Sequence, residues 1–164
     1  MERSRWRRWL HRSPARWGAF GFRALIPKSV GEPTGKQDLL VQFARGEIGR
    51  HPYLWGAKVF GQTAPLDCSG FSQVCFQQIG VEIGPGTWHQ REYCKAHGQL
   101  VTAPYQAADI LFFMDDGPVT PSHVGIATDE GTVIEETASF TANVVESPIT
   151  PRWSQPFVEG WRIL

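Results

Sequence analysis

Cysteine is scarce in this sequence, and its pattern excludes two kinds of site. Three cysteines, Cys68, Cys75 and Cys94, occur among 164 residues. An odd number without a Cys-x-x-Cys pair indicates neither a disulfide framework nor a zinc site built on thiolates. We therefore expect free thiols, no metal site and no cofactor.

Long apolar runs are missing as well. The chain contains no stretch of eighteen apolar residues, so we expect no membrane-spanning helix. Hydrophobic residues make up 41% of the chain and charged residues 20%, a composition typical of a globular protein. A chain of this length suffices for one domain with a core of its own, and we expect a monomer.

The formal net charge of the chain is zero, but basic and acidic residues are distributed unevenly between two regions. Residues 1–30 carry eight Lys or Arg and a single acid, Glu2, which leaves eight basic and fifteen acidic residues in the remainder. Pro and Gly are frequent over residues 27–35. We interpret residues 1–35 as a basic, aromatic-rich arm and linker, and residues 36–164 as the folded domain.

The arm allows three interpretations. Its Trp, Leu and Phe residues recur at roughly helical spacing, so it is either a basic amphipathic segment that binds an anionic surface or a disordered arm whose aromatics cover part of the body. Anionic lipid, cell-wall polymer and nucleic acid are candidate surfaces, with no specific recognition of nucleic acid expected. A transit peptide is the third interpretation. Arginine interrupts the apolar residues too often for a secretory signal peptide.

Three helices are predicted in the first part of the domain. They cover about 34–49, 67–80 and 87–97. Capping-box patterns mark two of the starts, Thr34 with Gln37 and Thr87 with Gln90. The apolar positions expected to face the core are Leu39, Leu40, Phe43 and Ile48 in the first helix, and Phe71, Val74, Cys75 and Ile79 in the second.

After residue 105 the apolar pattern alternates, which is typical of strands. Turn residues separate the alternating segments. The predicted strands are Ile110–Phe113, Val124–Thr128, Thr132–Thr137, Val144–Glu146 and Val158–Ile163. Helices followed by an antiparallel sheet indicate the α+β class.

Cys68 is the candidate nucleophile because it stands at the start of the second predicted helix. A thiol attacks as its thiolate, and the positive end of a helix dipole favours that anion. Asp67 suits the N-cap position, Gly70 keeps the helix entrance narrow, and the backbone N–H of Cys68 can point at an oxyanion. Cysteine is more often a buried apolar residue, and that interpretation suits Cys75 and Cys94.

The nucleophile needs a base, and histidine is the usual one. The chain offers His11, His51, His89, His97 and His123. The first lies in the arm, the second in a loop before a proline, and the next two on the short third helix, where we expect exposure. His123 begins a strand of small residues against which a helix can pack closely, so it is the candidate base.

Strand alternation supplies a residue to orient the imidazole. If Ile134 joins Ile126 in the core, Glu135 shares the face of His123. A carboxylate at that place would select the tautomer and stabilise the imidazolium. The alternative is an exposed acidic pair, Glu135 and Glu136, at a strand end.

Four blocks in order resemble the NlpC family of papain-like peptidoglycan endopeptidases of bacteria and phages, over roughly residues 37–164. The blocks are Tyr53-Leu54-Trp55-Gly56, Asp67-Cys68-Ser69-Gly70-Phe71, Ala108-Asp109-Ile110-Leu111-Phe112-Phe113 and Ser122-His123-Val124-Gly125-Ile126. The resemblance implies a papain-like α+β core and hydrolysis of an amide in a peptidoglycan stem peptide, typically between D-γ-glutamate and a diamino acid. It matches Cys68 to the nucleophile and His123 to the base.

The resemblance also assigns a substrate side to the site. Tyr53 matches a tyrosine near the nucleophile that supports the substrate or the oxyanion. Asp67 and Ser69 match positions that hold the amine in members acting on a free N-terminal alanine. The third catalytic position, commonly histidine, is Glu135 here. Two glycines of the family pattern are also replaced, by Ala57 and Ala108.

Two other functions stay open, because a fold does not set a substrate. One is a papain-like amidase that acts on a non-cell-wall substrate, and the other is a non-catalytic phage or cell-wall protein that keeps the fold. A peptidoglycan substrate implies a protein of the cell envelope or a secreted one, although the sequence shows no clear export signal. The alternative is a protein kept in the cytoplasm until release.

Overall fold

The computed structural model describes residues 35–114, 119–139, 142–149 and 157–164. The predicted basic arm, and Thr34 of the first capping-box pattern, lie outside these ranges. Among the described residues, no helix combines the length and the apolar composition needed to cross a bilayer.

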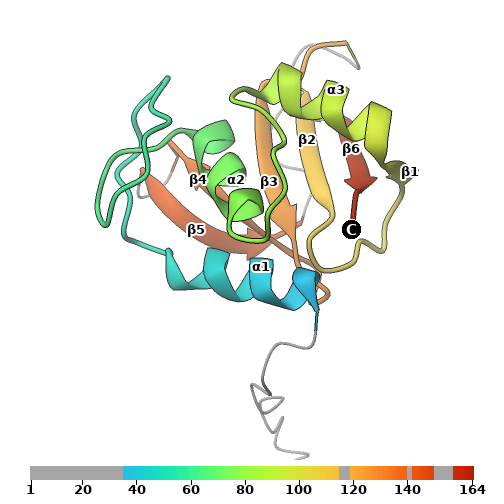
Figure 1. Cartoon of the computed structure of the whole chain (residues 1–164), viewed down its shortest axis with the longest axis horizontal. Coiled ribbons are helices and arrows are strands. Elements are labelled where there is room, and N and C mark those ends of the chain that lie inside the picture. Colours follow the sequence, from blue (N-terminus) through green and yellow to red (C-terminus); the bar gives the residue numbers. More distant parts are fainter. Residues whose placement is uncertain (1–34, 115–118, 140–141, 150–156) are drawn as a thin grey trace, which may run out of the picture. The chain divides into compact units, whose positions relative to one another are not determined.

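Three helices lead into a six-stranded antiparallel sheet (Figure 1). The helices are α1 (Lys36–Gly46), α2 (Cys68–Gln77) and α3 (Thr87–His97). The strands are β1 (Gln99–Val101), β2 (Ile110–Met114), β3 (His123–Ala127), β4 (Thr132–Thr137), β5 (Asn143–Pro148) and β6 (Phe157–Arg162), in the spatial order β1-β6-β2-β3-β4-β5. The α+β class is therefore confirmed, with α2 at the centre of the helical layer.

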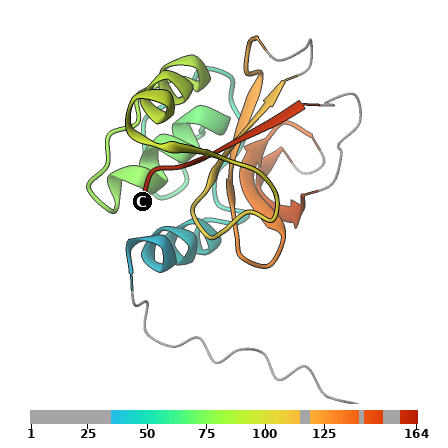
Figure 2. The ribbon, with the colours of Figure 1, turned by 90° about the vertical axis from the view of Figure 1, so that its right-hand side faces the viewer.

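All three helices cover the same face of the sheet, as Figure 2 shows. The main core lies between the two layers, because alternate residues of each strand point toward the helices. Its members from the sheet include Ile110, Phe112, Val124, Ile126, Ile134 and Val144, all buried. A smaller cluster on the opposite face contains Leu111, Phe113, Ala127 and Val133. Helix α2 packs against β3 and β4, which brings its first turn to the strands that carry His123 and Glu135.

Helix α1 buries a stripe that matches the predicted one in part, since Leu40 is buried and Phe43 packs against the core as predicted. Leu40, Val41 and Ala44 are buried, whereas Leu39 is 46% and Ile48 is 41% exposed. The helix ends at Gly46, so the helical period that placed Ile48 on the apolar face no longer applies there. The predicted end near Gly49 was therefore wrong.

The capping-box prediction for Thr87 and Gln90 was also wrong, because the N-cap of α3 is Gly86, which makes no side-chain cap. The N-cap of α1 is Gly35, and the predicted capping residue Thr34 lies outside the described residues. Thr87 is the first residue of α3, and its hydroxyl donates instead to the carbonyl of Pro121 at 3.2 Å. Short strand β1 was not predicted, since three residues carry too little alternation to detect.

The strand predictions agree with the structure to within one or two residues at each end. Thr132–Thr137 is matched in full, and β3 begins one residue earlier than predicted, at His123. Ala108, before β2, has φ 67°, a left-handed conformation that glycine adopts more easily. This is one of the two positions at which the sequence departs from a glycine of the pattern that it resembles.

Candidate active site

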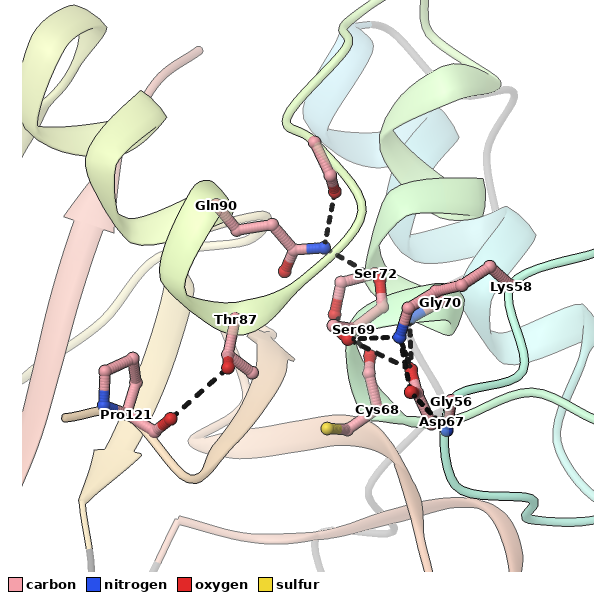
Figure 3. A network of polar contacts seen from close by, with 11 residues as sticks. Gly56, Lys58, Asp67, Cys68, Ser69, Gly70, Ser72, Thr87, Gln90 and Pro121 are labelled. Atoms are coloured by element: carbon pink, nitrogen blue, oxygen red, sulfur yellow. Dashed lines mark hydrogen bonds and ion pairs between the residues drawn. The ribbon is translucent and has the colours of Figure 1, made fainter.

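Cys68 is the first residue of α2, and its thiol is free and almost fully buried. Asp67 is the N-cap, as predicted: its backbone is extended, and its carboxylate accepts the N–H of Gly70 at 2.7 Å. Figure 3 shows the sulfur pointing away from this carboxylate. The thiol therefore lies at the positive end of the helix dipole, and the capping carboxylate of Asp67 is on the side away from it.

His123 contacts both Cys68 and Glu135. Its Nε2 lies 2.7 Å from Oε2 of Glu135, as strand alternation had placed the two residues. The Cys68 side chain also interacts with the ring and raises its pKa. Because Nε2 contacts Glu135, Nδ1 is the ring nitrogen left to interact with the sulfur. The side chain of His123 keeps 17% of its surface exposed.

These two contacts change the acidity of the imidazole. Burial by itself lowers the pKa of His123, but the hydrogen bonds and charges of Cys68 and Glu135 raise it to about 9. The ring is thus held as imidazolium at neutral pH. A thiolate next to an imidazolium is the reactive form of a cysteine hydrolase.

Neither acid of the Glu135–Glu136 pair is exposed, so the alternative of a solvated acidic strand end was wrong. Both side chains are 0% exposed. Glu135 faces His123, whereas Glu136 has no hydrogen-bond partner on either carboxylate oxygen among the described residues. Burial, with a smaller effect of Asp67 and against the effect of His123, raises the pKa of Glu136 to about 8.

The burial of Glu136 was not predicted from the sequence, although the alternation of the strand indicated it. Alternation puts Glu136 on the same face as Ile134, which lies in the main core. The burial of Ile134 therefore implied the burial of Glu136 as well.

Backbone pairing brings Tyr53 to the segment that leads into Cys68. Tyr53 forms a parallel bridge with Leu66, and its N–H donates to the carbonyl of Ala142 at 2.9 Å. Burial and the charges of Cys68, Asp67 and Glu136 raise the pKa of Tyr53 to about 12. The hydroxyl therefore stays protonated at neutral pH and is available as a hydrogen-bond donor.

Asp67 and Ser69 are joined by a residue that nothing in the sequence singles out. The ammonium group of Lys58 contacts both carboxylate oxygens of Asp67 and lies 2.7 Å from the hydroxyl of Ser69 (Figure 3). The two residues matched to an amine-binding role therefore already bind an amine that belongs to the chain itself.

Helix α3 braces both halves of the site. Buried Gln90 donates to the carbonyls of Ser69, at 2.7 Å, and Gly84, at 3.0 Å. Thr87 holds the carbonyl of Pro121, two residues before His123. Figure 3 shows both bonds running outward from the same turn of α3. The same helix thus sets the position of the first turn of α2 and of the segment that leads into β3.

The remaining thiols lie away from the site. Cys75 and Cys94 are 0% exposed in the main core, as their apolar interpretation predicted. Burial, with a contribution from Glu47, raises the pKa of Cys75 well above its usual value, and burial with the charge of Glu159 raises that of Cys94 to about 12. Both are therefore thiols at neutral pH.

The other histidines in the described residues lie outside the candidate site. His89 and His97 are exposed on α3. His51 is fully buried, where it contacts Glu47 and the carbonyl of Ala64 at 2.7 and 2.9 Å. It joins the end of α1 to the loop before α2. Within the described ranges, no three His, Cys, Asp or Glu side chains cluster in the manner of metal ligands.

Comparison with known proteins finds relatives of this chain. The family model of NlpC/P60 matches residues 49–162. The chain is similar to the NlpC/p60 domain of the peptidoglycan hydrolase SagA, with 28% identity and a TM-score of 0.57 over 75% of this chain and 96% of that one. It is also similar to the peptidoglycan hydrolase RipB from Mycobacterium tuberculosis, with 26% identity and a TM-score of 0.61 over 79% of this chain and 65% of that one.

The same fold occurs in a protein without catalytic activity. RipD from Mycobacterium tuberculosis is a non-catalytic NlpC/p60 domain protein adapted to peptidoglycan binding, and it shares 19% identity and a TM-score of 0.61 with this chain, over 79% of this chain and 98% of its own. A search of the curated proteins finds no match. The fold by itself therefore does not separate a hydrolase from a binding protein.

Proposed function

The chain belongs to the NlpC/P60 family, and from this premise we propose that it is a cysteine hydrolase that cleaves an amide bond in peptidoglycan stem peptides. The observation that carries the proposal is the arrangement of Cys68, His123 and Glu135: a thiol at a helix N-terminus, an imidazole whose pKa this thiol raises, and a buried carboxylate 2.7 Å from Nε2 of that imidazole. Solved relatives with this fold include peptidoglycan hydrolases.

In the proposed reaction the Cys68 thiolate attacks the carbonyl carbon of the scissile amide. The electron pair of the C=O moves onto oxygen, where the backbone N–H of Cys68 and the hydroxyl of Tyr53 donate to the resulting oxyanion. When the tetrahedral intermediate collapses, the C–N bond breaks and the imidazolium of His123 gives its proton to the leaving nitrogen. The products of this half are a free amine and a thioester on Cys68.

Water completes the cycle. Neutral His123 takes a proton from a water molecule that attacks the thioester, and the C–S bond breaks to release the carboxylic acid and the thiolate. Glu135 keeps Nδ1 of His123 directed at the sulfur in both halves and stabilises each imidazolium. We assign the bond, following the family resemblance, to the amide between D-γ-glutamate and the next diamino acid.

The substrate also sets the place of action. Peptidoglycan lies outside the cytoplasm, so we propose that the protein works in the cell envelope or after release. The basic arm over residues 1–30 would add affinity for an anionic surface, and that part of the proposal rests on its composition alone.

One experiment tests the proposal directly. Purified protein, Cys68→Ala and the control Cys75→Ala are incubated with peptidoglycan fragments, and the products are identified by mass spectrometry. We expect the wild type and Cys75→Ala to release the same pair of fragments and Cys68→Ala to release none. Cleavage by Cys68→Ala would place the nucleophile elsewhere. No cleavage by the wild type, combined with retained binding of the fragments, would identify a binding protein instead.

A further inference from the structure

Lys58 holds an unusual position for a loop lysine, since its ammonium group lies between the two residues that flank the nucleophile. It contacts both carboxylate oxygens of Asp67 on one side of Cys68 and the hydroxyl of Ser69 on the other. Figure 3 shows the side chain reaching across the first turn of α2 to make these contacts. A cation therefore already occupies the polar site formed by the two residues that flank Cys68 in the chain.

The carboxylate of Asp67 has little capacity left for a second cation. Besides Lys58 it accepts the N–H of Gly56 at 3.0 Å, the N–H of Gly70 at 2.7 Å and the hydroxyl of Ser69 at 3.0 Å. Its side chain is only 9% exposed, whereas that of Lys58 is 29% exposed. Lys58 is thus the more accessible member of the pair, with the carboxylate buried beside it.

The charge of this carboxylate is well compensated. Burial alone favours the protonated form, but Lys58, the N–H of Gly70 and the hydroxyl of Ser69 together lower the pKa of Asp67. Asp67 is therefore ionised at neutral pH and paired with an ammonium. An incoming substrate amine would meet a neutralised pair and the positive charge of Lys58 itself.

The backbone brings Lys58 to this place. The carbonyl of Ala57 accepts the N–H of Asp67 at 3.1 Å. A Cβ at Gly70 would lie 2.5 Å from that carbonyl and 3.3 Å from Cα of Lys58, so the absence of a side chain at Gly70 lets the segment approach. Lys58 therefore reaches its partners from a segment that is hydrogen-bonded to the start of α2.

We propose that Lys58 is a specificity-determining residue that fills the cation site beside Cys68 and thereby selects stem peptides whose nearby amino group is acylated over those in which it is free. The reason is electrostatic. A free ammonium on the substrate must displace Lys58 from Asp67 and Ser69 in order to bind there, whereas an uncharged amide nitrogen binds without displacing Lys58. This inference rests on the proposed function, since it concerns the substrate of the same site.

The test compares two peptidoglycan fragments that are identical except for the amino terminus, which is free in one and acetylated in the other. We expect the wild type to show a kcat/KM at least tenfold higher for the acetylated fragment. Lys58→Met, which keeps the length of the side chain and removes its charge, should shift this ratio at least tenfold toward the free amine. Lys58→Arg, which keeps the cation, should retain the wild-type preference.

Lys95→Met is the matched control, because Lys95 is a lysine on α3 that pairs with Glu92 at 2.7 Å, outside the site. It should leave the ratio unchanged. An unchanged ratio in Lys58→Met, or a wild-type preference for the free amine, would overturn the inference. If Lys58→Met fails to fold, Lys58→Gln takes its place, since its amide still donates to Asp67 without a charge.

A binding measurement separates this inference from the proposed function. Both fragments are titrated by calorimetry into Cys68→Ala and into Cys68→Ala combined with Lys58→Met. The inference requires the double variant to gain at least tenfold in affinity for the free amine and little for the acetylated fragment. An equal gain for both fragments would refute it. Failure of the wild type to cleave either fragment would refute the proposed hydrolysis alone.

Discussion

The carboxylate of Glu135 lies 2.7 Å from Nε2 of His123, across two neighbouring strands of the sheet. Gly125 makes room for this contact, because a Cβ at that position would lie 2.5 Å from Cγ2 of Val133 and 3.3 Å from Cβ of Glu135. The small residue in the strand that begins with His123 therefore has a structural role. It lets a buried acid on β4 reach an imidazole on β3.

The first prediction concerns the pH dependence of activity. Because the pKa of His123 is raised to about 9, the imidazolium persists up to that pH, and the alkaline limb of kcat/KM should lie near 9. Glu135→Gln removes one of the charges that hold the proton. We expect its alkaline limb to move toward neutral pH and its kcat at pH 7 to fall at least about tenfold. Steady-state rates from pH 5 to 10 measure both effects.

The same experiment discriminates an orienting role from a structural one. If Glu135→Gln lost activity equally at every pH, with an unchanged limb, Glu135 would serve packing rather than the imidazolium. The control is Glu92→Gln on the exposed face of α3, which should leave the whole profile unchanged.

The second prediction concerns Tyr53. If its hydroxyl donates to the oxyanion, Tyr53→Phe should lower kcat by about 10²–10³-fold and change KM little, since the hydrogen bond strengthens only in the transition state. Tyr93→Phe, on the far part of α3, serves as the control. A large rise in KM with an unchanged kcat would show that Tyr53 binds the ground state instead.

The third prediction concerns thiol reactivity. Cys75 and Cys94 are fully buried and their pKa values are raised, so iodoacetamide should modify the folded protein at Cys68 first. Peptide mapping by mass spectrometry after short exposures measures the order. His123→Ala should slow the modification of Cys68 at neutral pH. Equal labelling of all three cysteines in the folded protein would contradict this prediction.

The fourth prediction concerns stability. An acid whose pKa is raised in the folded state destabilises the fold once the unfolded chain ionises. For Glu136, with a folded pKa of about 8, this loss begins near pH 4.5 and grows until about pH 8, because the unfolded state binds fewer protons in that window. Glu136→Gln should therefore match the wild type near pH 4 and exceed it by a few kcal/mol, as an order of magnitude, at pH 8.

Urea denaturation at the two pH values measures this difference. Glu82→Gln, at an exposed position between α2 and α3, should show no comparable change between pH 4 and 8. A constant difference between Glu136→Gln and the wild type at every pH would indicate a packing effect and contradict the ionisation argument.

Much of the site followed from local patterns in the sequence. Cys68 stood out because a capping acid and a glycine at a helix start are short-range features that the chain specifies within a few residues. His123 and Glu135 followed from alternation in two strands. The positions of the core residues in α1 were less predictable, because the helix ended at Gly46 and tertiary packing selected Leu40, Val41 and Ala44.

What the sequence determined by itself was the run of three helices before the longer strands, the position of Cys68 at a helix start and the faces of His123 and Glu135 within their own strands, since each follows from capping or periodicity among residues close together in the chain. Only the tertiary structure revealed that Lys58 reaches Asp67 and Ser69 and that Gln90 and Thr87 brace the site from α3. These contacts join residues from 9 to 34 positions apart, and no local spacing records which distant side chains the packing of helices on a sheet will bring together.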